Sequence, residues 1–261
     1  MILLMAILSV LVQAEPESTN TAVLKFGGPV GDVQVRPISK DSLLLAYRTD
    51  GSDCVGKRDL FVCLPMLGLT SESYDELFRS FRQVDTGSTK NVKCPRWLRY
   101  DLRGHGSSRI DGKDTLDFRT MPQSQFQKYP NDVLKGLRFA LTPGTNQYDT
   151  SAITVIGASI GANTAAILTE DIPYIKRLVL LSPGINYKGL QPAEAIKSFQ
   201  GKILMVASQA DEYSYNSVRE MARLNSDHVT LMIFEGDAHG TDIINGNPQA
   251  MQALVDWLLK E

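Results

Sequence analysis

The chain has 261 residues, of which 43% are hydrophobic and 21% are charged, and its formal net charge is −2. These values are ordinary for a globular protein that buries a full core. No run of lysine or arginine stands out, which argues against nucleic acid or an anionic membrane surface as the main partner.

The first residues predict an export signal. The apolar run Ile2–Val12 is too short to cross a bilayer as a helix, which takes about 20 residues. Small residues, Val12 and Ala14, stand at the positions that a signal peptidase recognises. We therefore expect a signal peptide over residues 1–14 and a secreted or periplasmic mature chain, 15–261, without stable membrane insertion. Because no basic residue precedes the run, a retained anchor or a buried N-terminal segment is the alternative.

The three cysteines give only weak support for export of the protein. Cys63 lies inside an apolar run and is expected to be a buried core thiol. Cys54 and Cys94 each stand a few residues before a predicted strand, so a disulfide would be geometrically allowed if those strands are parallel neighbours. Such a bond would form in an oxidising compartment, and two unrelated free thiols are the alternative.

Short apolar runs alternate with helical patterns along most of the chain. The runs are bounded by glycine, proline or polar residues, as expected for strands buried on both faces. They are Leu43–Arg48, Leu60–Leu64, Trp97–Asp101, Ile153–Ala158, Arg177–Leu181, Ile203–Ala207 and Val229–Phe234. A further strand or hairpin, antiparallel at the sheet edge, is expected within Val23–Pro37.

The helical segments carry apolar residues at three-to-four spacing behind a capping or small residue. They are Ser71–Val84, Asn131–Leu141, Gly161–Glu170, Ser214–Leu224 and Asn247–Lys260. Strands that alternate with helices predict a single α/β domain with a doubly wound, mostly parallel sheet of about eight strands. Ile110–Tyr129 is expected to be irregular. The segment between Leu181 and Lys202 leaves room for one short helix, Pro192–Phe199, so a large lid is not expected.

A possible nucleophile stands in the motif Gly157-Ala158-Ser159-Ile160-Gly161. The motif follows an apolar strand and opens a helix, so the serine hydroxyl is expected to project above the sheet from a tight turn. The positive end of the following helix would face that hydroxyl. A glycine-flanked turn without chemistry is the alternative, since the motif alone is weak.

A nucleophilic serine needs a base, and the chain has three histidines. His105 lies in a turn upstream of the serine, and His228 precedes a strand. His239 follows a strand, in a glycine-bounded loop downstream of the serine. Because ligands bind outside the carboxyl ends of parallel strands, His239 is the strongest candidate for the base.

The acid that orients the base should follow another strand, between the serine and the histidine in chain order. Asp211 does so after the strand Ile203–Ala207, and the adjacent Glu212 is the alternative. No carboxylate directly follows the strand Arg177–Leu181.

These features together resemble the α/β-hydrolase family of serine hydrolases, from about Leu43 to the C-terminus. The resemblance rests on the turn Asp101–Ser108, the turn Gly157–Gly161, and the loops that carry Asp211 and His239. The short segment before Lys202 is similar to the small-esterase and dienelactone-hydrolase-like branch, although that branch often has a cysteine nucleophile.

The resemblance implies that Ser159, His239 and Asp211 form a catalytic triad. It also implies an oxyanion hole made by two backbone N–H groups, one of them from Ile160. The other would come from Met66, with Leu67 as the alternative.

The loop after Leu60–Leu64 departs from the common family pattern, because Leu64-Pro65 stands where many members have His-Gly. Proline has no N–H to donate, which is why Met66 is the candidate. In the same family His105 is implied to be a structural turn residue.

The expected activity is hydrolysis of a small or medium-sized carboxylic ester through an acyl-enzyme. Peptidase, thioesterase and cofactor-free perhydrolase activities would use the same triad, and a non-catalytic binding protein is a further alternative. The sequence shows neither metal-ligand spacing nor a phosphate-binding glycine loop, so no cofactor is expected.

Overall fold

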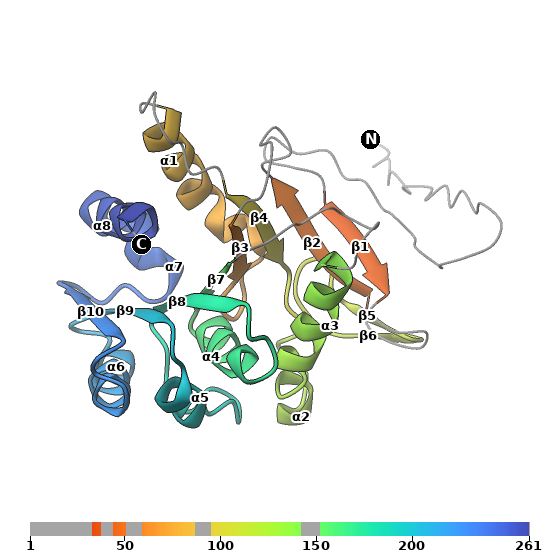
Figure 1. The fold of residues 1–261 in the computed structure, drawn as a ribbon. Helices are drawn as coiled ribbons and strands as arrows, with labels where there is room; N and C mark the ends of the chain where they lie inside the picture. The colour runs from red at the N-terminus through yellow and green to blue at the C-terminus, as the bar shows by residue number, and fades with distance from the viewer. Residues whose placement is uncertain (1–32, 38–43, 51–58, 87–94, 142–151, 261) are drawn as a thin grey trace, which may run out of the picture.

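The apolar runs form the centre of one large sheet in the computed structural model, which describes residues 33–37, 44–50, 59–86, 95–141 and 152–260. Within these residues the strand order of the sheet is β1-β2-β4-β3-β7-β8-β9-β10 (Figure 1). The strands are β1 (Val33–Pro37), β2 (Leu44–Asp50), β3 (Leu60–Leu64), β4 (Arg96–Tyr100), β7 (Ile153–Ala158), β8 (Ile175–Leu181), β9 (Lys202–Ser208) and β10 (Val229–Phe234). β1 and β2 pair antiparallel, β2 and β4 pair antiparallel, and the other neighbours are parallel. The expected mostly parallel sheet is confirmed.

The chain changes direction across the sheet at β3. It passes from β3 outward to β4, and then returns to the other side of β3 to form β7. The chain therefore leaves β3 toward α1 on one face and β7 toward α4 on the other, and parallel sheets bind ligands at the carboxyl ends of strands at such a point. The loop that carries Met66 and the turn that carries Ser159 lie at this switch point.

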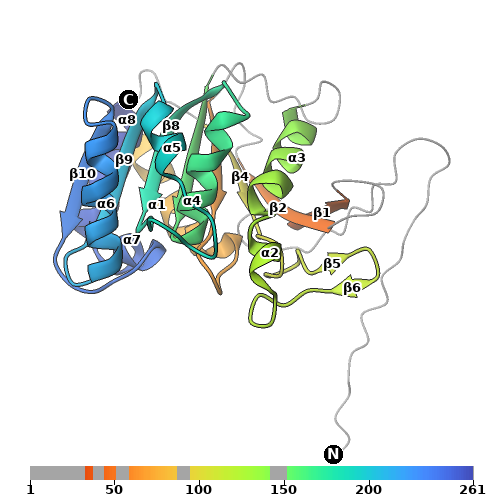
Figure 2. The ribbon, with the colours of Figure 1, turned by 90° about the horizontal axis from the view of Figure 1, so that it is seen from below.

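Helices cover both faces of the sheet (Figures 1 and 2). On one face are α1 (Asp75–Thr86, after a 3-10 turn over Ser71–Tyr74), α7 (Thr241–Gly246) and α8 (Pro248–Lys260). On the other face are α3 (Tyr129–Leu141), α4 (Ile160–Ile167), α5 (Ala193–Ser198) and α6 (Glu212–Leu224). The connection between β8 and β9 contains a single helix, α5, as the sequence predicts.

Two hydrophobic clusters fill the space between the sheet and these helices. Trp97 is central to the cluster beneath α1 and α8, and its ring meets Phe61 edge to face at 5.0 Å and Phe78 at 5.6 Å. On the other face α4 is buried on almost every side, because it lies between the sheet and its neighbours α3 and α5. The helix that follows Ser159 is therefore enclosed by the sheet and its neighbouring helices.

The segment expected to be irregular is more ordered than the sequence indicates. It contains the hairpin of β5 (Ile110–Asp111) and β6 (Asp114–Thr115), followed by α2 (Gln123–Phe126). The buried guanidinium of Arg103 organises this region: its Nε donates to Asp132 at 2.6 Å, and it also pairs with Asp111. A charge network of this kind leaves no hydrophobic periodicity, which explains why the pattern predicts a loop.

Several sequence predictions concern residues outside the described ones. They are the signal peptide over residues 1–14 and the pairing of Cys54 with Cys94, which stay predictions. Cys63 is fully buried, as expected. None of the helices within the described ranges has the length and apolar character needed to cross a membrane.

Candidate active site

Ser159 stands in a strained turn between β7 and α4. Its φ of 53° and ψ of −120° are uncommon for a residue other than glycine. The turn is held by the Ser159 N–H, which donates to the Leu181 carbonyl at 2.7 Å. A Cβ at Gly157 would lie 2.6 Å from the Ala162 Cα, and one at Gly161 would lie 2.5 Å from the Pro65 carbonyl oxygen. Both glycines of the motif are therefore required by close backbone packing.

The N-terminus of α4 lies directly beside this serine. Ala162 and Asn163 donate their N–H groups to the Ser159 carbonyl at 2.9 and 3.2 Å. Ile160 is the first residue of α4, so its N–H has no acceptor within the helix. The helix dipole adds partial positive charge at the same point. The geometry leaves the Ile160 N–H available to a developing oxyanion.

The loop after β3, which carries Met66, is held firmly at its base. The buried Tyr74 hydroxyl donates to the Leu64 carbonyl at 2.8 Å and lies 3.3 Å from the Ile156 carbonyl, so it links the ends of β3 and β7. Burial raises the pKa of the Tyr74 phenol well above its ordinary value, which keeps the donor protonated. Farther along, the Leu69 N–H donates to the Met66 carbonyl at 3.2 Å and closes a tight turn.

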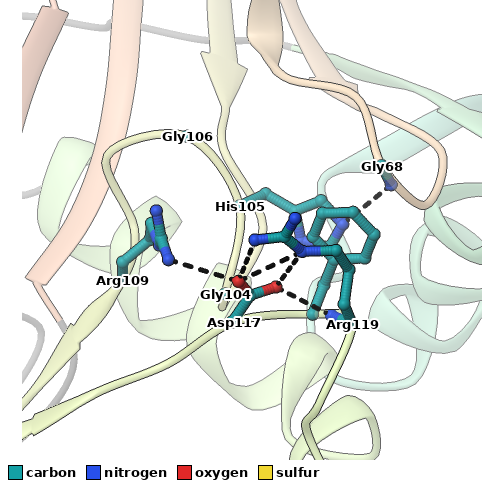
Figure 3. Close-up of a pocket in the computed structure, with 8 residues that line it drawn as sticks. Gly68, Gly104, His105, Gly106, Arg109, Asp117 and Arg119 are labelled. Atoms are coloured by element: carbon teal, nitrogen blue, oxygen red, sulfur yellow. Dashed lines mark hydrogen bonds and ion pairs between the residues drawn. The ribbon is translucent and has the colours of Figure 1, made fainter.

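His105 stabilises the turn that contains Gly68, as Figure 3 shows. Its Nε2 accepts the Gly68 N–H at 3.0 Å, while Nδ1 donates to the Arg103 carbonyl at 3.1 Å. The ring stacks on Phe118 with centroids 4.4 Å apart. Burial lowers the pKa of His105, which favours the neutral tautomer that this pattern requires. The structure thus gives the predicted turn residue a specific contact with the loop of Met66.

A small cavity of about 80 Å³ lies beside His105, lined on its outer side by a charged trio. Arg109 and Arg119 both pair with Asp117, as Figure 3 shows. The Gly68 turn forms the opposite wall. These ion pairs are largely exposed, so they contribute little to stability.

Asp211 and His239 meet at the carboxyl end of the sheet. The Asp211 Oδ2 lies 2.6 Å from the His239 Nδ1, and its Oδ1 caps α6 by accepting the Ser214 N–H at 3.4 Å. Because a carboxylate only accepts, Nδ1 carries the proton and Nε2 is left as the basic nitrogen. Glu212 is exposed on the first turn of α6. The geometry therefore favours Asp211 over Glu212 as the orienting acid.

The loop of His239 is tied to the other two loops of the site. The Gly240 N–H donates to the buried Ser182 hydroxyl at 2.9 Å. A Cβ at Gly240 would lie 2.6 Å from the Met66 Sδ and 3.4 Å from the Ala158 Cβ. Since Ala158 precedes Ser159, the loops that carry the candidate base, the candidate nucleophile and Met66 converge here.

Two hydroxyl groups near His239 escape prediction from sequence. The Tyr187 hydroxyl lies 3.1 Å from the Ser214 Oγ, and that oxygen lies 3.4 Å from the His239 Nδ1. The Tyr187 ring meets the imidazole edge to face, with centroids 6.2 Å apart. Neither residue belongs to a motif, and no sequence signal could have indicated them.

The remaining histidine lies away from this edge. His228 precedes β10, at the opposite end of that strand from His239, and its Nδ1 donates to the Gly201 carbonyl at 3.1 Å. Across the described part of the chain, no group of three histidine, cysteine or acidic residues is placed to hold a metal ion.

Comparisons of this sequence and structure with known proteins identify its family and its fold. The sequence profile described as serine aminopeptidase, S33, matches residues 95–237, which is more than half of the chain. No curated protein matches the sequence closely enough to count as a relative.

Solved structures share the fold at low identity. An esterase from Pyrococcus furiosus has a TM-score of 0.65 at 16% identity, covering 94% of this chain and 99% of its own. A predicted CIB-like hydrolase from Thermoplasma acidophilum gives 0.61 at 17%, covering 88% and 99%. Est1E from Butyrivibrio proteoclasticus, solved with ferulic acid bound, gives 0.63 at 15%, covering 85% and 97%. The chain belongs to the S33 serine aminopeptidase family and is a hydrolase of the α/β-hydrolase fold.

Proposed function

We propose that the protein is a serine hydrolase that cleaves carboxylic esters of small to medium size. The observation that carries this proposal is the 2.6 Å contact between Asp211 and the His239 Nδ1. It lies at the carboxyl end of the sheet, where Ser159 occupies a strained strand-to-helix turn. A base oriented by a half-buried acid, beside such a serine, is the arrangement that nucleophilic acyl transfer requires.

Acylation begins when the His239 Nε2 takes the proton of the Ser159 hydroxyl. The serine oxygen attacks the ester carbonyl, and the carbonyl oxygen becomes an oxyanion held by the N–H groups of Ile160 and Met66. The intermediate then collapses: the bond to the alcohol oxygen breaks, and that oxygen takes the proton from the imidazolium. The products of this half-reaction are the free alcohol and an ester on Ser159.

Deacylation repeats the sequence with water. The water oxygen attacks the acyl carbon while His239 takes its proton, and collapse returns both the electron pair and a proton to the Ser159 oxygen. Asp211 stabilises the imidazolium in both halves. Every proton in this scheme is moved by residues of the chain.

Esters are favoured over peptides by the solved structures that share the fold, of which the one from Pyrococcus furiosus is an esterase. The short connection between β8 and β9, with α5 as its single helix, also supports a site open to small acyl groups. The family description supports aminopeptidase activity as the second candidate. Thioester hydrolysis, perhydrolysis and a non-catalytic binding role are the remaining alternatives.

Labelling with a fluorophosphonate tests the nucleophile. We expect one adduct, which peptide mapping locates on Ser159, and we expect Ser159→Ala to abolish both the adduct and ester hydrolysis. Ser226→Ala, at an exposed serine preceding β10, is the matched control and should label like the wild type. A folded protein that takes no adduct and hydrolyses no ester would refute the proposal and favour a binding role.

A pair of substrates separates the two enzyme classes. An alanine p-nitrophenyl ester and alanine p-nitroanilide share the acyl group and differ in the bond that breaks. We expect a much larger kcat/KM for the ester, together with equal cleavage of the N-acetylated ester. Preference for the anilide, lost when the amine is acetylated, would instead establish an aminopeptidase.

A further inference from the structure

The loop between β8 and α5 presents a tyrosine to the site and holds it rigidly. The buried Asn163 of α4 donates its amide to the carbonyls of Gly184 and Leu190, both at 2.8 Å, and accepts the Gly184 N–H at 3.1 Å. Tyr187 and Leu190 exchange two backbone hydrogen bonds at 2.9 and 3.1 Å. These hydrogen bonds fix the backbone at Gly184, Tyr187 and Leu190, so the Tyr187 backbone has little freedom.

The side chain of Tyr187 is directed at the candidate triad. Its ring packs edge to face against the His239 imidazole. Its hydroxyl shares a hydrogen bond with the Ser214 Oγ at 3.1 Å, and the Ser159 side chain is near enough to lower the pKa of the phenol. The phenol therefore lies beside the candidate base and the candidate nucleophile, and it is held there by Ser214, whose Oγ lies 3.4 Å from the His239 Nδ1.

The directions of these hydrogen bonds follow from the proposed triad. His239 donates from Nδ1 to the carboxylate, and Ser159 donates its proton to Nε2. The lone pairs of the Ser159 oxygen then need a donor, and the Tyr187 hydroxyl is in place to supply one while accepting from Ser214. Burial raises the pKa of Tyr187, and its hydrogen bonds with Ser214 and Ser159 offset only part of this rise. The phenol stays protonated at neutral pH and acts as a donor rather than a base.

We propose that Tyr187 is a further catalytic residue, whose hydroxyl donates a hydrogen bond to the Ser159 oxygen and speeds its departure during deacylation. This inference rests on the proposed function. In that step the bond between the acyl carbon and the Ser159 oxygen breaks, its electron pair moves to the oxygen, and His239 returns the proton. Tyr187 keeps its own proton throughout and stabilises the charge that builds on the departing oxygen.

The effect should differ between the two half-reactions. If the serine hydroxyl accepts this hydrogen bond before substrate binds, little is gained when it attacks. In the acyl-enzyme the ester oxygen accepts it weakly, whereas the departing oxygen accepts it strongly. Only an interaction that strengthens toward the transition state accelerates a step, which assigns the larger effect to deacylation.

Pre-steady-state kinetics of Tyr187→Phe with p-nitrophenyl acetate tests this assignment. We expect a burst of about one nitrophenolate per active site, followed by turnover slower than the wild type by roughly 10- to 100-fold, the range for a lost hydrogen bond to a charged group. The burst rate itself should change by less than about threefold. Quenched mass spectrometry should find the acetyl group accumulating on Ser159.

A control and a second variant keep the test decisive. Tyr174→Phe alters an exposed tyrosine that precedes β8, at the opposite end of that strand, and should behave like the wild type. Ser214→Ala removes the group that donates to Tyr187 and should slow the same step by a smaller factor; it also serves if Tyr187→Phe does not fold. Unchanged deacylation, or equal slowing of both half-reactions, would overturn the role of Tyr187. Failure of the proposed function differs, because the wild type itself would then form no acyl-enzyme.

Discussion

Replacing Asp211 with asparagine would test the acid of the triad with a minimal change in shape. The side chain keeps its volume, and the amide oxygen can still cap α6 by accepting the Ser214 N–H. What changes is the contact with the His239 Nδ1, which is 2.6 Å long in the structure. An amide NH₂ turned toward Nδ1 would force the ring proton onto Nε2, the nitrogen that must act as the base.

The expected loss of kcat in Asp211→Asn has two causes. In the proposed mechanism His239 becomes an imidazolium beside the Asp211 carboxylate. Two unit charges about 4 Å apart, at an effective dielectric constant near 20, attract each other by about 4 kcal/mol. Since 1.36 kcal/mol corresponds to a factor of ten in rate, loss of this attraction alone lowers kcat by roughly 10³. The wrong tautomer adds to this, and the same substitution in other triads costs about 10⁴.

The assay is steady-state hydrolysis of a p-nitrophenyl ester, with thermal unfolding to show that the variant is folded. Glu212→Gln is the matched control, because it makes the same chemical change one residue away on an exposed side chain. We expect Asp211→Asn to lose about 10³- to 10⁴-fold in kcat and Glu212→Gln to stay within about twofold. If Glu212→Gln causes the large loss instead, the structural assignment of the acid is wrong.

Two further substitutions probe the supports of the site. Gly161→Ala should lower both the melting temperature and kcat. A Cβ at this position would lie 2.5 Å from the Pro65 carbonyl oxygen and would push the Met66 loop away. A variant with the wild-type melting temperature and the wild-type kcat would refute this close packing. As pH falls below 6.5, the unfolded chain protonates His105 before the folded chain does, because burial lowers the folded-state pKa, so stability should decline over that range. Urea unfolding of wild type and His105→Gln at about pH 7.5 and 5 checks this: the variant should lose less stability, and an equal loss would contradict the role of His105.

The sequence predicts the bounds of three strands well because their signal is local. β3, β7 and β10 have the bounds expected from the runs Leu60–Leu64, Ile153–Ala158 and Val229–Phe234. β3 and β7 are buried along their whole length, so each is continuously apolar and ends where the polar residues begin. β10 lies at the sheet edge and is partly exposed, but its apolar run also ends at polar residues. The same logic locates the strand ends after which Ser159, Asp211 and His239 stand. Chain order and strand ends therefore suffice to nominate these three residues.

The supports of the site cannot be predicted in this way, because they are contacts between distant parts of the chain. His105 meets Gly68 across 37 positions, and Ser182 meets Gly240 across 58. In each pair one partner is a backbone N–H, which every residue except proline possesses. A backbone partner leaves no mark on the residue type, so these contacts become visible only once the fold brings the loops together. The position of Tyr187 near His239 escapes prediction for the same reason.

The ends of β7 and β8 show how the candidate nucleophile differs from a structural serine. Ser159 and Ser182 each follow a strand, have φ near 50°, and donate their N–H at 2.7 Å to a carbonyl of the neighbouring strand. The backbone strain, of order 1–3 kcal/mol at each, is thus offset in the same way. The next residue in the chain distinguishes the two serines: Ile160 brings an N–H at a helix terminus, whereas Pro183 has none to donate. The Ser182 hydroxyl instead accepts the Gly240 N–H and fixes the His239 loop. One backbone arrangement, used twice on adjacent strands, thus provides both the candidate nucleophile and the anchor for its base.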